Sequence, residues 1–182
     1  MKCQRLMSII RGESPAGLIL RNGKVVNVFS GEVYAADVVV DSGKIVALGS
    51  GFKGEEEVDL EGRIVCPGFF DAHVHIESSM VTIPEFARCV VPRGTTTVVI
   101  DPHEIANVMG LDGIRYMLQS SKYQPLNVYV MIPSCVPATH LETSGSELRA
   151  VDLFPYVGQE WILGLGEMMN FPGVLFCDPE VV

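Results

Sequence analysis

The sequence predicts an α/β fold in two parts: an N-terminal β module over residues 1–66, and the first half of a TIM-like (β/α)8 barrel over residues 67–182. Three observations predict it. Short apolar segments separated by Gly-containing turns fill residues 17–66, as in all-β structure. After Pro67, β-branched segments alternate with segments of helical periodicity, which indicates parallel β/α units. Polar side chains follow each of these strands, at the end where barrels carry their active sites.

Only four β/α units fit before Val182, whereas a complete barrel takes about 250 residues. The chain is therefore expected to be a fragment of a longer enzyme that contains half of the barrel. A complete open α/β domain with four strands is the alternative.

Three turn signals organise the β module. Asn22-Gly23 favours a type I′ turn, so a hairpin is expected there. A second hairpin is expected at residues 41–43, and a short strand pair around Glu61-Gly62. Together these elements predict a sandwich-like β module. The expected strands cover residues 18–20, 25–26, 36–40, 44–48, 58–60 and 63–65.

The second part alternates strands with helices. The segment 94–100 is apolar and β-branched throughout, as expected for a strand buried on both faces. Thr82 and Glu85 have the spacing of a capping box ahead of a short helix. Leucine, isoleucine and methionine recur at helical spacing from Leu111. Further strands are expected at residues 126–132 and 161–166, and a partly helical stretch at 147–157.

Two histidines separated by one residue, His73 and His75, are the most informative feature of the chain. Residues i and i+2 of a strand point to one face, so Asp71, His73, His75 and Glu77 are expected together, with the apolar residues between them facing helices. Imidazole is a common ligand of zinc and iron, and a nearby carboxylate can ligate the metal or orient the ring. The pattern predicts a metal site; an exposed edge strand with chance histidines is the alternative.

Other polar residues follow the later strands. Asp101, His103 and Glu104 come directly after the strand at 94–100, where contact with a substrate, support of metal ligands and simple loop capping are all open. A Ser-Cys pair at 134–135 follows the next strand, and buried packing is favoured for the cysteine over a nucleophilic role. Glu167 ends the fourth strand. The carboxyl ends of parallel strands lie at one edge of a sheet, so these groups are expected to share a site.

Composition limits the partners and the compartment. Net charge is −9 and the sequence pI is about 4.8, which argues against nucleic acid as a partner. No apolar run approaches the roughly 18 residues of a membrane span. The five cysteines form no Cys-x-x-Cys pair, so free thiols in a reducing cytoplasm are expected.

The segment Pro-Gly-Phe-Phe-Asp-Ala-His-Val-His-Ile-Glu-Ser-Ser-Met resembles the first barrel strand of the amidohydrolase superfamily. Together with several other long segments, it resembles the adenine deaminase family within that superfamily. The resemblance covers nearly the whole chain from about Leu18. Its segments span residues 67–80, 94–107, 133–139, 141–145 and 165–173.

The resemblance implies hydrolytic deamination of a small-molecule substrate, adenine, to hypoxanthine and ammonia at a centre of two divalent metals (manganese, iron or zinc). His73 and His75 match the metal ligands of the first barrel strand. Glu167 matches the catalytic carboxylate of the fourth strand, which bridges both metals. The family's remaining metal-binding histidines and its catalytic aspartate belong to later strands. The chain by itself is therefore expected to bind metal weakly and to be inactive.

Two other interpretations stay open. The chain could belong to an amidohydrolase that acts on a cyclic amide or a different amino-substituted ring, or to a non-catalytic domain that retains the fold. Half a barrel also leaves two strand edges unpaired, and an open edge favours association. The isolated chain is therefore expected to form a homo-oligomer or to be poorly soluble, whereas an intact barrel would cover those edges.

Overall fold

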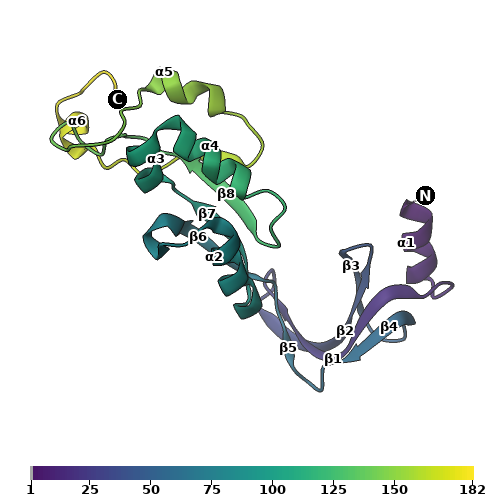
Figure 1. The fold of residues 1–182 in the computed structure, drawn as a ribbon. Coiled ribbons are helices and arrows are strands. Elements are labelled where there is room, and N and C mark those ends of the chain that lie inside the picture. The colour runs from purple at the N-terminus through teal and green to yellow at the C-terminus, as the bar shows by residue number, and fades with distance from the viewer. Residues whose placement is uncertain (1) are drawn as a thin grey trace. The chain divides into compact units, whose positions relative to one another are not determined.

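The structure, a computed structural model, describes residues 2–182. The chain divides into two compact units, one that ends at Pro67 and one that runs from Gly68 to Val182. Each unit has its own β-sheet (Figure 1). The α/β fold class, with a β module followed by parallel β/α units, is confirmed.

The first unit is a single five-stranded sheet with a short helix beside it. Strands follow the order β3-β2-β1-β4, and β5 also pairs with β1. Ile9 of the helix is buried together with Ala16, Ile19 and Val39 of the sheet. A sheet backed by a helix differs from the sandwich-like packing that was predicted, and the helix was not foreseen. The elements are α1 (Lys2–Ile10), β1 (Ala16–Asn27), β2 (Glu32–Asp41), β3 (Lys44–Gly49), β4 (Gly54–Asp59) and β5 (Ile64–Val65).

The hairpin predicted at Asn22-Gly23 is wrong, because β1 continues through both residues. The pairing with β2 shifts between Leu20 and Gly23, which makes a β-bulge. Asn22 has φ +56° and donates its backbone N–H to Asp37 Oδ1 at 3.0 Å. An Asn-Gly pair signals a positive φ, which a bulge uses as readily as a turn. The chain reverses later, between Asn27 and Glu32.

The other two turn predictions have different outcomes. The hairpin at residues 41–43 is confirmed, with Asp41 opposite Lys44 and positive φ at the two turn residues between them. The strands on either side of Glu61-Gly62 do exist as β4 and β5, but they do not pair with each other. Both run parallel to successive stretches of β1, which is long enough to hold them in line.

A buried aspartate ties helix α1 to the sheet. Asp41 is only 8% exposed and accepts hydrogen bonds from Arg5 Nη2 at 2.7 Å, Arg5 Nε at 3.0 Å and the Gly17 N–H at 3.1 Å. The side-chain hydrogen bond from Arg5 is the main reason that the pKa of Asp41 is lowered to about 2. The folded state therefore favours the charged form of the Asp41 carboxylate over the protonated form.

We predict that Asp41→Asn destabilises the first unit at neutral pH and makes its stability less sensitive to acid. The pKa of aspartate is about 3.9 in an unfolded chain and about 2 here. Its contribution is therefore complete above pH 4 and is lost as the pH falls through the folded value. Thermal unfolding between pH 7 and pH 2 measures this contribution of Asp41 to stability. Glu13→Gln, in an exposed pair with Arg11, is the control with little expected effect; equal behaviour of the two variants would contradict the assignment.

The second unit is a parallel four-stranded sheet in the order β6-β7-β8-β9, as predicted. Helices connect the strands along the chain (Figure 1). The strands are β6 (Phe69–Val74), β7 (Thr95–Ile100), β8 (Asn127–Ile132) and β9 (Ile162–Leu165). The helices are η1 (Ile76–Ser79), α2 (Ile83–Val90), η2 (Val91–Arg93), α3 (His103–Met109), α4 (Leu111–Ser120), α5 (Ala150–Leu153), η3 (Phe154–Tyr156) and α6 (Phe171–Leu175).

The core of this unit lies between the sheet and helices α2 and α4. Alternate residues of β7 and β8 point to the helices because side chains of a strand alternate between its faces. Their β-branched side chains fill this layer without polar groups. Its buried members include Ile83 and Ala87 of α2, Val98 and Ile100 of β7, Met117 of α4, and Val128 and Val130 of β8. This packing fixes the carboxyl ends of the strands at one edge of the sheet.

Three local details depart from the sequence analysis. Thr82 is the N-cap of α2, but its side chain makes no capping hydrogen bond, so the capping box does not form. Helix α3 was not foreseen. Strand β6 ends at Val74, which places Glu77 in the 3-10 turn η1 and not on the strand. Phe70 is 58% exposed and is not covered by helices, contrary to the sequence prediction; it belongs to β6, which lies at the end of the strand order.

Within residues 2–182, no helix is both long and apolar enough to cross a lipid bilayer.

Candidate metal centre

The two histidines of the β6 segment meet at the carboxyl end of the sheet. His73 lies in β6 and His75 directly after its end. Their Nε2 atoms are 3.0 Å apart, and the rings are nearly perpendicular, at 78°. The prediction that both imidazoles share one face is confirmed. Their ring nitrogens converge on one point, which is the arrangement that two ligands of one cation require.

Glu167 reaches the same point from the end of β9, although about 90 residues separate it from the histidines in sequence. Its Oε1 lies 3.3 Å from His75 Nε2, and its Oε2 lies 3.8 Å from His73 Nε2. One potential ligand atom from each of the three residues lies within 4.8 Å of the others. The parallel sheet brings them together because β6 and β9 end at the same edge.

The backbone of Glu167 is held from both sides. Its N–H donates to Asp101 Oδ2 at 3.0 Å, and its carbonyl accepts a hydrogen bond from Ser134 Oγ. The preceding residue, Gly166, leaves room for Asp101: a Cβ there would stand 2.3 Å from Asp101 Oδ2. In the sequence, Ser134 is recognisable only as a polar residue at a strand end. Its contact with Glu167 depends on the pairing of β8 with β9, which the sequence does not reveal.

Glu104 at the start of α3 orients the second histidine. Its Oε2 lies 3.1 Å from His75 Nδ1, and its Oε1 accepts a hydrogen bond from Ser78 Oγ at 2.8 Å. A carboxylate on Nδ1 favours the tautomer in which Nε2 presents its lone pair. Burial lowers the pKa of His75, but the charges of Glu104, Asp101 and Glu167 outweigh burial, so the pKa is raised overall.

Two of the acidic residues predicted for this face lie outside the group. Asp71 is exposed and accepts the backbone N–H of His73 at 3.2 Å, so it braces the strand end. Glu77 turns away in η1 and accepts the Ile105 N–H at 3.4 Å. Burial raises the pKa of Glu77. Glu77 does not face the histidines because β6 ends at Val74, and the alternation of side chains between the faces of a strand no longer applies after that residue.

Asp101 and His103 are the buried neighbours of Glu167. Asp101 is fully buried and His103 is 2% exposed. Asp101 Oδ1 lies 2.6 Å from His103 Nδ1. With Glu167 they form a second group whose potential ligand atoms lie within 4.8 Å of one another. Of the residues named from the sequence, the structure therefore brings together His73, His75, Asp101, His103, Glu104 and Glu167.

The donor set fits a transition-metal ion. Two imidazole nitrogens and a carboxylate suit zinc, iron or manganese better than calcium or magnesium. Three protein ligands also leave positions open for a water and a substrate, as catalytic metal sites do. Glu104 supplies the outer carboxylate that such histidines usually have.

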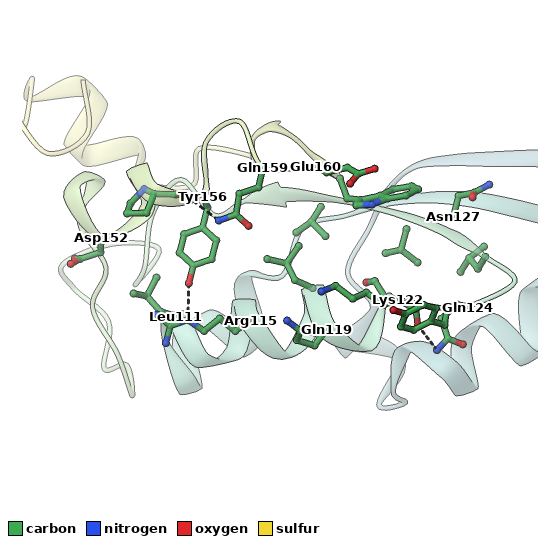
Figure 2. Close-up of a pocket in the computed structure, with 18 residues that line it drawn as sticks. Leu111, Arg115, Gln119, Lys122, Gln124, Asn127, Asp152, Tyr156, Gln159 and Glu160 are labelled. Carbon is green, nitrogen blue, oxygen red and sulfur yellow. Dashed lines mark hydrogen bonds between the residues drawn. The ribbon is translucent and has the colours of Figure 1, made fainter.

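A hollow of about 1110 Å³ lies elsewhere in this unit, between α4, β8 and η3. Figure 2 shows its polar rim, where Arg115 Nε donates to the Tyr156 hydroxyl at 2.9 Å. None of the six grouped residues lines it. The candidate metal ligands and the hollow therefore lie at different places in this unit.

A parallel β/α sheet with two histidines at the end of its first strand and a carboxylate after its fourth indicates a class of hydrolases, and a family comparison agrees. The profile of the amidohydrolase family matches residues 64–170. The chain belongs to the amidohydrolase family.

Within the family, the chain is similar in sequence to adenine deaminases. One from Desulfatibacillum aliphaticivorans is 52% identical over 178 residues, which is 98% of this chain and 31% of that protein. One from Clostridium acetobutylicum is 53% identical over 171 residues, or 94% of this chain and 30% of that protein. The chain thus spans about 30% of the length of the curated relatives it matches.

Solved structures show the same fold. A β-aspartyl dipeptidase of Fervidobacterium islandicum AW-1 matches with a TM-score of 0.54 at 21% identity, over 85% of this chain and 41% of that one. An N-acyl-D-glutamate deacylase of Bordetella bronchiseptica, solved in complex with zinc, matches with a TM-score of 0.52 at 20% identity, over 65% of this chain and 30% of that one. At these identities the likeness concerns the fold alone.

Proposed function

We propose that this chain provides part of the active site of a hydrolase that converts adenine to hypoxanthine and ammonia. The observation that carries the proposal is the meeting of His73, His75 and Glu167 in a chain about half identical to adenine deaminases over almost all its residues. The rest of the relatives' length would supply further residues of the complete site.

His73, His75 and Glu167 are the residues that would hold a divalent metal, with manganese, iron and zinc as the candidates and two ions per complete site. Such a metal lowers the pKa of a bound water towards about 7 and so supplies hydroxide at neutral pH. Removal of the amino group from an aromatic carbon needs that nucleophile. Glu167, with one carboxylate oxygen toward each histidine, would be the ligand shared by the two ions.

The remaining residues of the site position these ligands. Glu104 holds Nδ1 of His75, so that Nε2 stays free of a proton and faces Glu167. Asp101 holds the Glu167 backbone and thereby the direction of its side chain. Asp71 and Glu77 act on the backbone around the histidines and η1, away from the reacting atoms.

Ammonia release by the full-length protein tests the substrate. We expect turnover of adenine well above that of guanine, hydantoin and dihydroorotate, with loss of turnover after chelation and recovery on addition of manganese, iron or zinc. Preferred turnover of hydantoin or dihydroorotate would show an amidohydrolase of cyclic amides instead. Absence of all turnover in a metal-loaded protein would favour a non-catalytic domain.

We predict that Glu104→Gln weakens metal binding about 10- to 100-fold, the usual cost of losing the carboxylate behind a metal-bound histidine. The variant keeps the side-chain volume but removes the charge that holds His75 Nδ1. Equilibrium dialysis with zinc measures the affinity. Glu85→Gln, on the exposed surface of α2, is the matched control, and an equal affinity in both variants would refute a role for Glu104.

The assembly and the compartment are proposed from features of the same chain. Strands β6 and β9 each have one partner among the described residues, and open edges favour association. We therefore propose that the isolated chain forms a homo-oligomer or is poorly soluble, whereas an intact barrel would cover these edges. Light scattering tests this, and a monodisperse monomer of the isolated chain would overturn it. The domain boundary at residues 66–67 and a cytoplasmic location are proposed as well. All five cysteines are unpaired, as expected in a reducing compartment.

A further inference from the structure

The hollow between α4, β8 and η3 has a chemistry of its own, apart from the candidate metal ligands. Its volume is about 1110 Å³, which is large enough for a small molecule, since such sites usually measure about 300–1,000 Å³. We propose that the hollow binds a free nucleoside monophosphate, with the base against Trp161 and the phosphate held by Arg115 and Lys122. This site goes beyond the function proposed above and does not depend on it.

The short connection between β8 and β9 leaves the hollow open. Helix α2 connects β6 to β7, and α4 connects β7 to β8, whereas the connection from β8 to β9 contains only α5 and η3, of four and three residues. The helical layer is therefore short beside these two strands. Because connections between parallel strands are right-handed, a helix that follows β9 would pack on the other side of that strand. It would leave the hollow accessible.

One wall of the hollow carries two cations. Arg115, Gln119 and Lys122 follow one side of α4 and its end, at the spacing i, i+4, i+7 (Figure 2). Arg115 donates from Nε to the Tyr156 hydroxyl at 2.9 Å and from Nη1 to Asp112 at 2.8 Å, so its guanidinium is held in place. Within residues 2–182, no ion pair of the second unit includes Lys122. A fixed guanidinium and an unpaired ammonium are the groups that bind phosphate.

Trp161 supplies an aromatic surface at the same hollow. Its ring is 44% exposed and lies 5.2 Å from the ring of Tyr129. Its carbonyl accepts the Val130 N–H at 2.8 Å, which fixes the backbone. That backbone has φ +74°, a conformation that bulky residues rarely adopt and that is most frequent at functional sites. Because nucleic-acid bases stack on aromatic side chains, a fixed and half-exposed indole suits a base.

The other polar groups of the hollow fit the rest of a nucleotide. The amides of Gln119 and Gln159 can pair with the edge of a base. Glu160 lies on the wall opposite α4 (Figure 2), and a carboxylate there can accept the hydroxyls of a ribose. Asp152 Oδ2 already accepts the Arg149 N–H at 2.9 Å. The net charge of −9 opposes a polynucleotide, so a free nucleotide is the ligand that the chemistry favours.

Calorimetric titration of the full-length, metal-loaded protein with uridine 5′-monophosphate tests the proposal. Uracil has no amino group, so the proposed deamination cannot consume this probe. We expect it to bind at least about tenfold more tightly than uridine or ribose 5-phosphate, which lack the phosphate and the base. Equal binding of ribose 5-phosphate would overturn the contact with the base, and equal binding of uridine that with the phosphate. Tighter binding of an oligouridylate would overturn the assignment to a free nucleotide.

Variants at the two walls locate the site. We expect Trp161→Leu to weaken binding about tenfold or more, and Trp161→Phe to keep most of it, because a ring remains. Lys122→Gln should weaken binding about tenfold. Phe154→Leu, at an exposed ring outside the hollow, and Arg88→Gln, in an exposed pair on α2, are the matched controls with wild-type affinity. Thermal unfolding of each variant shows which ones are folded.

Three results would overturn the site. The first is a wild-type protein that does not bind uridine 5′-monophosphate. The second is wild-type affinity in both Lys122→Gln and a folded Trp161→Leu. The third is loss of binding in His73→Ala, which would place the nucleotide at the metal centre. Failure of adenine turnover in the ammonia assay would overturn the proposed deamination and would leave the binding of uridine 5′-monophosphate unchanged.

Discussion

Replacing Glu167 with glutamine in the full-length protein is expected to remove most of the bound metal and nearly all turnover. The substitution keeps the shape of the side chain but removes the negative charge shared by both groups of ligands. We expect metal affinity to fall by more than the roughly 10- to 100-fold cost of losing a residue behind a ligand. Turnover falls with it, because hydroxide at neutral pH depends on the bound metal.

Folding should survive this substitution. The Glu167 side chain is 46% exposed, and the hydrogen bonds that hold its backbone come from Asp101 and Ser134. Thermal unfolding is therefore expected to stay cooperative and near the wild-type midpoint. Glu160→Gln, an exposed residue just before β9, is the control. Wild-type metal content and turnover in Glu167→Gln would show that the assignment is wrong.

Replacing Gly166 with alanine is expected to damage both stability and metal binding. The new Cβ would stand 2.3 Å from Asp101 Oδ2 and 2.8 Å from its Cγ, closer than atoms can approach. Asp101 is fully buried and has little room to move, so β9 or the aspartate must shift. Overpacking of this kind costs about 1–3 kcal/mol, and the shift would also displace the adjacent Glu167 and its hydrogen bond to Asp101.

Gly164→Ala is the matched control in the same strand, because its new Cβ would meet only Met131 Cε, at an ordinary 3.6 Å. Chemical denaturation and zinc dialysis of both variants measure the two effects. We expect Gly164→Ala to behave like the wild type. A Gly166→Ala variant with wild-type stability and affinity would mean that Asp101 does not fill the space beside Gly166.

Patterns with a strong period predicted the structure well. The continuous β-branched run of β7 indicated a buried parallel strand, and the spacing of His73 and His75 indicated two imidazoles on one side. The histidine signal follows from the two-residue alternation of strands, and the β7 signal follows from the burial of both faces of a parallel sheet. The meeting with Glu167 followed from the rule that parallel strands present their carboxyl ends together.

Where local chemistry admits two structures, the sequence did not decide between them. Asn22-Gly23 supplies the positive φ of a hairpin turn, but pairing with β2 uses it for a bulge. Glu77 continues the alternation of the histidines, but the strand ends at Val74 and a 3-10 turn takes it elsewhere. These outcomes depend on partners distant in sequence.

The supports of the site were the least predictable part. Ser134 contacts Glu167 only because β8 lies beside β9, and Gly166 is needed only because Asp101 comes from β7. No spacing in the sequence encodes such contacts. Glu104 was named among the candidates, but its contact with His75 Nδ1 also required the position of helix α3.

Anomalous diffraction from crystals of the zinc-loaded protein, recorded at the zinc edge, tests the central claim most directly. We predict a peak between His73 Nε2, His75 Nε2 and the Glu167 carboxylate, with metal–nitrogen and metal–oxygen distances of about 2.0–2.2 Å. Zinc bound elsewhere, with both imidazoles free of metal, would contradict the account.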